Sequence, residues 1–255
     1  MDNKIDVQEQ FGRSAQSYVE SSLHKKGKDL QLLLSLTQLH GTEQVLDVAT
    51  GGGHTANAFA PHVANVTAVD LTEEMLLAAE RFIRGNGYEN VEFIRGDAEK
   101  LPFANQSFDL VACRIAPHHF PNVESFVSEV FRVLKPNGMF LLDDNVAPEE
   151  DELDLFYNQI EKLRDYSHFR AWKKTEWIRM LELAGFTIHQ FHHFEKTFQF
   201  ASWCQRMSLS NEVQQHLATI IKQAPPKVKE KFRIRIDGEE VVSFAGEAMV
   251  LSAAK

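Results

Sequence analysis

The chain has 255 residues, of which 44% are hydrophobic and 25% charged, with a formal net charge of −9 at pH 7. This composition predicts one large globular domain with a sizeable core. The negative charge argues against nucleic-acid binding, which usually needs a basic face. The basic run at residues 222–235 is interpreted as a solvated helix face.

The chain carries no signal of an oxidising or membrane environment. Its two cysteines, Cys113 and Cys204, form no pair motif, and residues 1–10 are too polar for a signal peptide. No stretch approaches the roughly 18 apolar residues of a membrane span. We therefore expect a cytoplasmic protein without a membrane span, either a monomer or a homodimer.

Residues 1–40 show helical spacing of their apolar side chains, and from Gln44 the pattern becomes strand, turn and helix in repetition. Thr72 is expected to cap the helix that follows it. The other helices of this region are expected at His54–Pro61 and Val123–Leu134, the second ended by residues 135–138. The expected strands are Val45–Ala49, Val66–Val69, Val91–Ile94, Phe108–Cys113 and Met139–Leu142.

The alternation breaks after Asn145. Helices are expected at Leu155–Leu163, Lys174–Ala184 and Ser202–Gln223, and Pro225 and Pro226 should break the last of them. Phe186–Phe200 alternates like a strand. Residues 232–253 predict a hairpin that turns at Asp237 and Gly238.

Together these elements predict an α/β fold: a Rossmann-like, doubly wound, mostly parallel seven-stranded sheet with an antiparallel C-terminal hairpin and inserted helices. No flexible linker separates the parts, so residues 1–255 are treated as one domain. Within it we expect an N-terminal helical lid at 1–40, a ligand-binding core at 41–145, and substrate-side insertions at 146–175 and 201–231.

The segment Val45–Thr55, VLDVATGGGHT, is the most informative one. A strand that ends in glycines and opens a helix can hold a ligand against backbone N–H groups, because glycine accepts positive φ and allows close approach. The next strand ends in Asp70, nineteen residues after Gly51. An acid there can accept hydrogen bonds from both ribose hydroxyls of a nucleoside.

The glycine loop alone leaves the ligand open. Gly51-x-Gly53-x-x-Ala56 also fits the dinucleotide fingerprint, which would indicate NAD. Two features favour S-adenosylmethionine instead. Asp47 can organise the loop and face a cationic amino-acid group, and Asp97 in the loop after the third strand can accept a hydrogen bond from an adenine amino group.

The chain resembles the class I methyltransferases that use S-adenosylmethionine, in the methyltransferase type 11 group that includes the ubiquinone/menaquinone C-methyltransferases. The order and spacing of six segments carry the resemblance, which spans residues 10–186. Ala49 departs from it, because the family often has glycine there. The matching segments are QFGRSAQSY at 10–18, VLDVATGGG at 45–53, VTAVDLTEEML at 66–76, GDAEKLPF at 96–103, SFDLVACRIAPHHF at 107–120 and FRVLKPNG at 131–138.

The resemblance implies a role for each matching residue. Gly51 and Gly53 would lie beside Ala49 against the methionine part of the cofactor, with Asp47 nearby. Asp70 would bind the ribose. The adenine would be recognised by residues of two loops, and Arg114 would line the site near the amino-acid group. The residues implied for adenine are Leu71, Asp97 and Ala98. Phe11 and Tyr18 would belong to the lid, or would simply pack in an amphipathic helix.

Methyl transfer is displacement at a methyl carbon, so the protein mainly aligns the reactants and excludes water. A base is needed only where the acceptor must lose a proton. The candidate groups follow the fourth and fifth strands or lie in the later insertion, and His119 and His168 are preferred among them. They are His118, His119, Asp143, Asp144, Asn145 and His168. A plain polar or packing role is the alternative for each histidine. No metal site is expected: His192 and His193 are adjacent in a strand and point to opposite faces.

The acceptor side is expected in Arg164–Trp177, which is similar to a substrate-side segment of bacterial relatives. We expect Tyr166, His168, Arg170 and Trp172 on or near the acceptor pocket. Further aromatic residues of this region either mark an apolar small molecule or pack between helices; they are Phe156, Tyr157 and Trp177.

The sequence thus predicts a methyltransferase that converts S-adenosylmethionine to S-adenosylhomocysteine and methylates a small-molecule acceptor, whose identity the sequence does not give. Two alternatives stay open. One is an NAD-dependent oxidoreductase, for which no Tyr/Lys pair or zinc ligand set is visible. The other is a non-catalytic module that binds S-adenosylmethionine.

Overall fold

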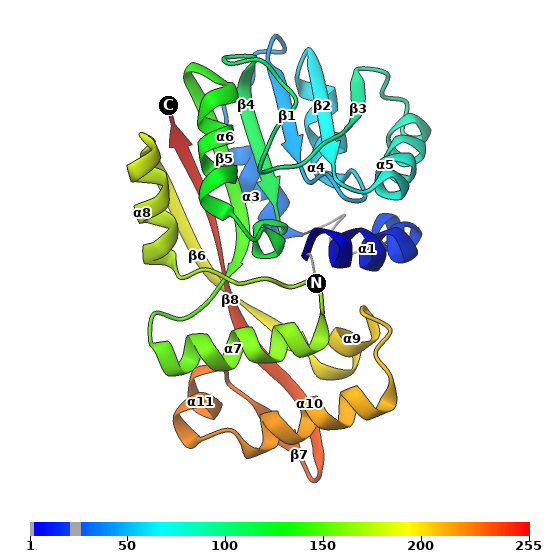
Figure 1. Cartoon of the computed structure of the whole chain (residues 1–255), viewed down its shortest axis with the longest axis vertical. Coiled ribbons are helices and arrows are strands. Elements are labelled where there is room, and N and C mark those ends of the chain that lie inside the picture. The colour runs from blue at the N-terminus through cyan, green and yellow to red at the C-terminus, as the bar shows by residue number, and fades with distance from the viewer. Residues whose placement is uncertain (1–2, 21–26) are drawn as a thin grey trace.

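A computed structural model describes residues 3–20 and 27–255, except for the side chains of residues 14–20. Its strands form one sheet (Figure 1), in the order β3-β2-β1-β4-β5-β8-β6, with β7 paired to β8 outside this path. The strands are β1 (Gln44–Val48), β2 (Asn65–Asp70), β3 (Val91–Arg95), β4 (Phe108–Arg114), β5 (Leu134–Val146), β6 (Thr187–Gln199), β7 (Arg235–Asp237) and β8 (Glu240–Ala254).

The first five strands run parallel, with β1 between β2 and β4. Val48 near the end of β1 is level with Val69 in β2 and Cys113 in β4. The carboxyl ends of these strands therefore open at one edge of the sheet, where ligands bind in open α/β folds. This arrangement confirms the predicted Rossmann-like class.

Helices cover both faces of the sheet. On one face α6 (Val123–Val133) and α8 (Lys174–Ala184) bury an apolar cluster that includes Phe126 and Trp177. On the other face α3, α4 and α5 bury a second cluster around Phe59 and Ile83. These helices, with the short ones between them, are α1 (Asn3–Glu20), α3 (Lys28–Ser35), α4 (His54–Phe59), η1 (Ala60–His62), α5 (Glu73–Gly85) and η2 (Pro117–His119).

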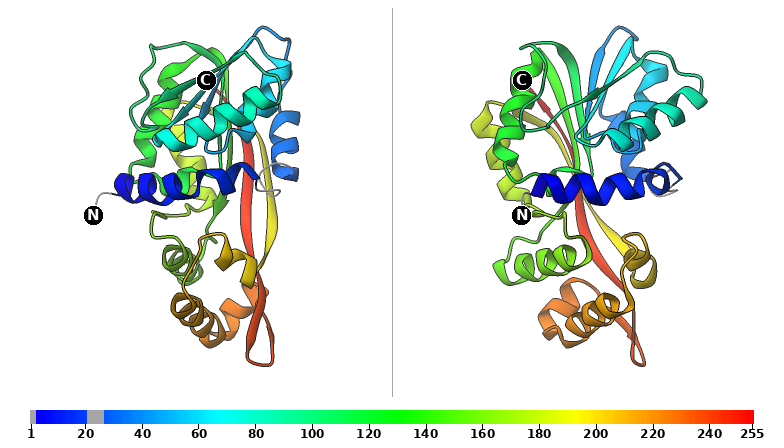
Figure 2. Two further views of the ribbon diagram at one scale, coloured as in Figure 1. Left: turned by 90° about the vertical axis from the view of Figure 1, so that its right-hand side faces the viewer. Right: turned by 45° about the vertical axis from the view of Figure 1, so that its right-hand side comes forward.

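The remaining helices form a third apolar cluster beyond the parallel strands. Figure 2 shows β6 and β8 running from the core into this helical part, with α1 lying across the middle of the molecule. The cluster buries Tyr157, Trp203 and Phe244, so the helical part has a core of its own. Its helices are α7 (Asp151–Arg164), α9 (Phe200–Gln205), α10 (Asn211–Gln223) and α11 (Pro226–Lys231).

Strand β8 connects the two parts. It pairs antiparallel with β5 on one side and with β6 on the other, so that Leu251 lies between Leu142 and Phe191. The predicted hairpin forms at Asp237 and Gly238, but β7 is short and pairs with the first residues of β8, 240–243. The sheet therefore has eight strands, where seven were predicted.

Several predicted boundaries differ from the structure. Helix α7 begins at Asp151, not at the expected Leu155, because acidic side chains favour the first turn of a helix. The helical segment after Ser202 is two helices, and Pro226 begins α11, where a missing N–H costs nothing. Thr72 precedes α5, but its side chain makes no capping hydrogen bond. Across the described ranges, no helix is long and apolar enough to cross a membrane.

Candidate functional site

The loop after β1 has the backbone conformation that its glycines predict. Gly51 and Gly53 have φ of +53° and +81°, and Ala49 also lies in the left-handed region, with φ of +55°. A Cβ on Gly51 would meet nothing within 4 Å, so the backbone there faces open space. A Cβ on Gly53 would lie 2.9 Å from the Cβ of Ala79. Gly51 therefore leaves room for a ligand, whereas Gly53 leaves room for α5.

Asp47 is buried under this loop and is hydrogen-bonded to it. It is 1% exposed, and its Oδ2 accepts hydrogen bonds from Thr50 Oγ1 at 2.6 Å and from the backbone N–H of Ala56 at 3.0 Å. Burial raises its pKa to about 7 in spite of these bonds. Asp47 thus organises the loop, as expected, and it belongs to the support of the site, not to its wall.

Asp70, at the end of β2, joins the glycine loop to the start of α5. Its Oδ2 accepts from the backbone N–H of Gly51 at 2.9 Å, and its Oδ1 accepts from that of Thr72 at 2.9 Å. Burial raises the pKa of this carboxyl group. Each oxygen keeps a further lone pair, so the group can still accept from a ligand hydroxyl.

The loop after β3 is tied to helix α1. Lys4 Nζ lies 2.6 Å from both Asp97 Oδ2 and Glu99 Oε2. Two further side chains of α1 reach the rim of the same site: Gln8 donates to the carbonyl of Leu71 at 3.1 Å, and Asn3 donates to that of His119 at 2.7 Å. Helix α1 is therefore fastened across the loops in which the adenine-recognising residues were predicted.

Arg114, the last residue of β4, is held between two carboxylates. Its Nε and Nη2 donate to Asp29 Oδ2 at 3.1 and 2.6 Å, and its Nε lies 3.2 Å from Asp143 Oδ2. Burial and the negative charge of Asp29 raise the pKa of Asp143 to about 7. The guanidinium is thus paired with carboxylates of the protein itself.

Three histidines gather where η2 meets the chain after α7. His118 Nδ1 lies 2.6 Å from Asp144 Oδ1, and its ring centroid is 4.3 Å from that of His119. The ring of His168 lies 5.5 Å from that of His118. Burial alone would lower the pKa of His118, but the Asp144 carboxylate outweighs it, so this pKa is raised.

The loops after the first four strands surround a cavity beneath α1. Expected residues in its wall are Ala49, Gly51, Asp70, Leu71, Asp97, Ala98, Arg114 and His119, together with Phe11 of the predicted lid. Among the described residues, Asp47, Gly53 and His168 are absent from this wall. Tyr18 lies in α1, but its side chain is outside the described part of the chain.

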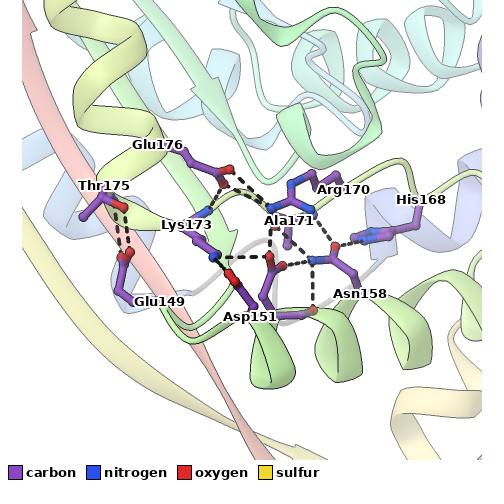
Figure 3. Close-up of polar contacts among 10 residues, drawn as sticks. Glu149, Asp151, Asn158, His168, Arg170, Ala171, Lys173, Thr175 and Glu176 are labelled. Atoms are coloured by element: carbon purple, nitrogen blue, oxygen red, sulfur yellow. Dashed lines mark hydrogen bonds and ion pairs between the residues drawn. The ribbon is translucent and has the colours of Figure 1, made fainter.

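The segment after α7 braces two helices. Arg170 Nη2 lies 2.8 Å from Asp154 Oδ2 and 3.3 Å from Glu176 Oε2, which links α7 to the start of α8 (Figure 3). His168 Nε2 lies 2.9 Å from Asn158 Oδ1 in the same network. Tyr166, Arg170 and Trp172 are not among the residues that line the cavity.

The aromatic side chains of this region also pack in cores. Trp177 is fully buried in the cluster under α6 and α8, and Trp172 packs against that cluster. Tyr157 and Phe156 belong to the helical part. Helix packing, the second of the two interpretations offered for these residues, accounts for them.

Several residues of the site had no signal in the sequence. Asp29, Lys4 and Val7 come from helices that looked merely amphipathic, and Glu99 and Phe120 lie in matching segments but were given no role. The partnership of Asp29 with Arg114 joins positions 85 residues apart. Only the tertiary fold brings such pairs together.

Comparison with known proteins identifies the class. Residues 46–142 match the model of the methyltransferase domain family. The uncharacterized methyltransferase YcgJ of Bacillus subtilis is 35% identical over 246 residues, which cover 96% of this chain and 97% of that protein. The chain therefore belongs to the methyltransferase family that its motifs resemble.

Two further relatives support this assignment. The crystal structure of BH2331 from Bacillus halodurans C-125 superposes with a TM-score of 0.88 and is 54% identical, covering 90% of this chain and 99% of that one. The ubiquinone/menaquinone biosynthesis C-methyltransferase UbiE of Brucella anthropi is 32% identical over 145 residues, 55% of each chain. The first likeness covers the helical part as well as the sheet, whereas the second covers about half of the chain.

Proposed function

We propose that the protein transfers a methyl group from S-adenosylmethionine to a small-molecule acceptor by direct displacement. The observation that carries this proposal is the cavity at the carboxyl ends of β1–β4, walled by the glycine loop, by Asp70 and by the Asp97 loop, in a chain of the methyltransferase family. The open space beside Gly51 fits a ligand lying against the backbone.

In this proposal Gly51 and Ala49 lie along the methionine part of the nucleoside and Asp70 accepts from its ribose. Asp97 and Ala98 meet the adenine. Both Asp97 oxygens are already engaged, by Lys4 and by the backbone N–H of Glu99 at 2.9 Å, so α1 and the adenine loop would close together. The nucleoside supplies an activated methyl group, and the protein supplies alignment and a site without water.

Residues 1–40 would then act as a lid over the cofactor. Phe11 contributes to the cavity wall, and its ring meets His119 edge-on at 5.0 Å. The three hydrogen-bonding side chains of α1 described above hold the helix in this place. The chain at 146–175 and the helices within 201–231 would border the acceptor from the opposite side.

Titration calorimetry with S-adenosylmethionine, S-adenosylhomocysteine and NAD tests the proposal. We expect micromolar binding of both sulfur nucleosides and none of NAD. Asp70→Asn should weaken nucleoside binding at least tenfold, because an uncharged amide accepts less strongly from the ribose. Asp237→Asn is the matched control, since this exposed residue lies in the distant β7.

Binding of NAD alone would replace the proposal by the oxidoreductase alternative. Binding of the sulfur nucleosides without methyl transfer to any acceptor would favour the non-catalytic module. Unchanged affinity in Asp70→Asn would remove this residue from the binding site.

A further inference from the structure

One histidine in the cavity wall is set up as a base. His119 Nδ1 lies 3.0 Å from the carbonyl oxygen of Ser167. A carbonyl can only accept, so Nδ1 must carry the proton and Nε2 must carry the free lone pair. Among the described residues, Nε2 has no hydrogen-bond partner, and its nearest acid, Asp165 Oδ2, is 4.0 Å away.

The charges around His119 keep it neutral. Burial and the charge of His118 lower its pKa to about 4. The pKa of His118 is in turn raised by Asp144, the buried carboxylate at the end of β5, whose Oδ1 lies 2.6 Å from His118 Nδ1. The other neighbours are Phe11 from α1 and His168, whose pKa is also lowered by burial. A neutral imidazole is therefore present throughout the physiological pH range.

A partner for the product cation is also in place. Burial disfavours the charged form of Asp165, but the hydrogen bonds from Ser167 and the positive charge of Arg164 favour it. Ser167 donates to Asp165 Oδ1 through its Oγ at 2.5 Å and through its backbone N–H at 2.9 Å, which fixes the carboxylate. An imidazolium formed at His119 would meet this negative charge.

The cations of the cavity wall indicate the charge of the acceptor. Arg114 is paired with Asp29 and Asp143, and Lys4 is paired with Asp97 and Glu99. An acceptor carboxylate or phosphate would have to compete with these carboxylates for its counter-charge. A neutral acceptor needs no such competition.

Resting on the methyltransferase function proposed above, we propose that His119 Nε2 takes a proton from the acceptor, and that the acceptor is a neutral molecule with a dissociable O–H or acidic C–H group, such as a phenol or an enol. The electron pair of the broken O–H or C–H bond stays on the acceptor, which uses it to form the new bond to the methyl carbon. The C–S bond breaks with its electrons going to sulfur, so the sulfonium becomes a neutral thioether. The proton on His119 later passes to water.

Nitrogen-15 NMR of histidine-labelled protein with bound S-adenosylhomocysteine tests the resting state without any acceptor. Comparison with His119→Asn assigns the resonances, and His189→Asn serves as an exposed control. At pH 7 we expect His119 to be neutral with the proton on Nδ1, and His118 to be protonated on both nitrogens. A cationic His119, or one with its proton on Nε2, would overturn the proposal.

Methyl transfer to two probes tests the chemistry. Phenol has a proton to lose, whereas iodide has none and needs no base. In His119→Asn, which keeps a donor for the Ser167 carbonyl, we expect transfer to phenol to fall about 10²–10⁴-fold. Transfer to iodide should stay within about threefold of the wild type, because nothing in that reaction is deprotonated.

An equal loss with both probes would show that His119 is only structural, and an equal retention would show that it is not the base. Where the wild type uses neither probe, the NMR measurement still decides the proposal. Failure of the wild type to bind S-adenosylhomocysteine would defeat the methyltransferase function itself. Normal binding together with a cationic His119 would defeat the assignment of the base alone.

Discussion

Ala49 has a backbone conformation that favours glycine. The family often has glycine here, and the φ of +55° gives the physical reason. A Cβ in the left-handed region costs about 1–2 kcal/mol, partly offset because alanine loses less chain entropy than glycine on folding. The departure from the family pattern is therefore tolerated at a moderate cost in strain.

We accordingly expect Ala49→Gly to stabilise the protein, by up to about 1 kcal/mol, without weakening nucleoside binding. Urea unfolding and calorimetry would measure the two effects. Ala64→Gly is the control, since Ala64 lies outside the left-handed region and should be slightly destabilised by the same change. A destabilised Ala49→Gly would mean that the methyl group packs usefully in the loop.

Some residues of the site were predictable from sequence because local chemistry marks them. Asp70 and Gly51 stand at the ends of a strand and of a glycine loop, and the structure joins them at 2.9 Å. His168 was predicted on or near the acceptor pocket from its neighbours in sequence; in the structure its Nε2 lies 2.9 Å from Asn158 Oδ1, and it is absent from the cavity wall. A sequence shows that a histidine follows a helix; it does not show which way the following loop turns.

At the scale of elements, the proposed lid function of helix α1 depends on the contacts that hold it over the cavity. The helix packs against α5, and its first turns reach over the cavity through Asn3, Lys4 and Gln8. Lys4 meets two carboxylates of the loop after β3, those of Asp97 and Glu99. Loss of this one side chain would free the start of the helix while its packing on α5 remains.

Lys4→Ala should therefore raise the dissociation rate of S-adenosylhomocysteine, by about 3–30-fold, with little change in global stability, because partly exposed ion pairs contribute modestly to folding. Stopped-flow fluorescence would give the rate. Arg13→Ala on the same helix is the control, as its ion pair with Glu9 is exposed and neither residue lines the cavity. Equal dissociation rates in both variants would argue against α1 as a lid.

The element pattern was predictable where hydrophobic periodicity is strong. Lys174–Ala184 has the predicted bounds and ends at Gly185, whose φ is +102°. The prediction failed where charge and tertiary pairing decide the outcome. The acidic residues 151–154 lay outside the expected helix but form the first turn of α7, and β7 adds a strand to the predicted seven by pairing with the start of β8.

At the scale of the whole molecule, Glu247 of β8 joins the sheet to the helical part. It meets Lys174 of α8 at 2.5 Å, His193 of β6 at 2.9 Å and Lys231 of α11. Burial alone would raise its pKa, but hydrogen bonds from the two lysines lower it to about 2. The carboxylate thus forms ion pairs with a helix that packs on the sheet, α8, and with a helix of the helical part, α11.

Glu247→Gln should destabilise the fold by about 1–3 kcal/mol at pH 7, because it leaves the surrounding cations without their counter-charge. A depressed carboxyl pKa stabilises the fold fully above the ordinary value of 4.5, and this contribution is lost as the pH falls toward about 2. The difference in the free energy of unfolding between wild type and variant should therefore shrink as the pH falls from 4.5 to about 2. Urea unfolding at several pH values measures it, with the exposed Glu239→Gln as control; a difference independent of pH would contradict the assignment.

The position of β8 also has a consequence for the order in which the chain can fold. Strand β6 precedes β8 in the sequence, yet among the described strands β8 is the one that pairs with it, and β8 separates it from β5. The first five strands can pair as they emerge, whereas β6 must wait, unpaired, through the helices that follow it. The last strand in the sequence therefore closes the sheet, and until it does, β6 is a long open edge on which a chaperone or a second chain could act.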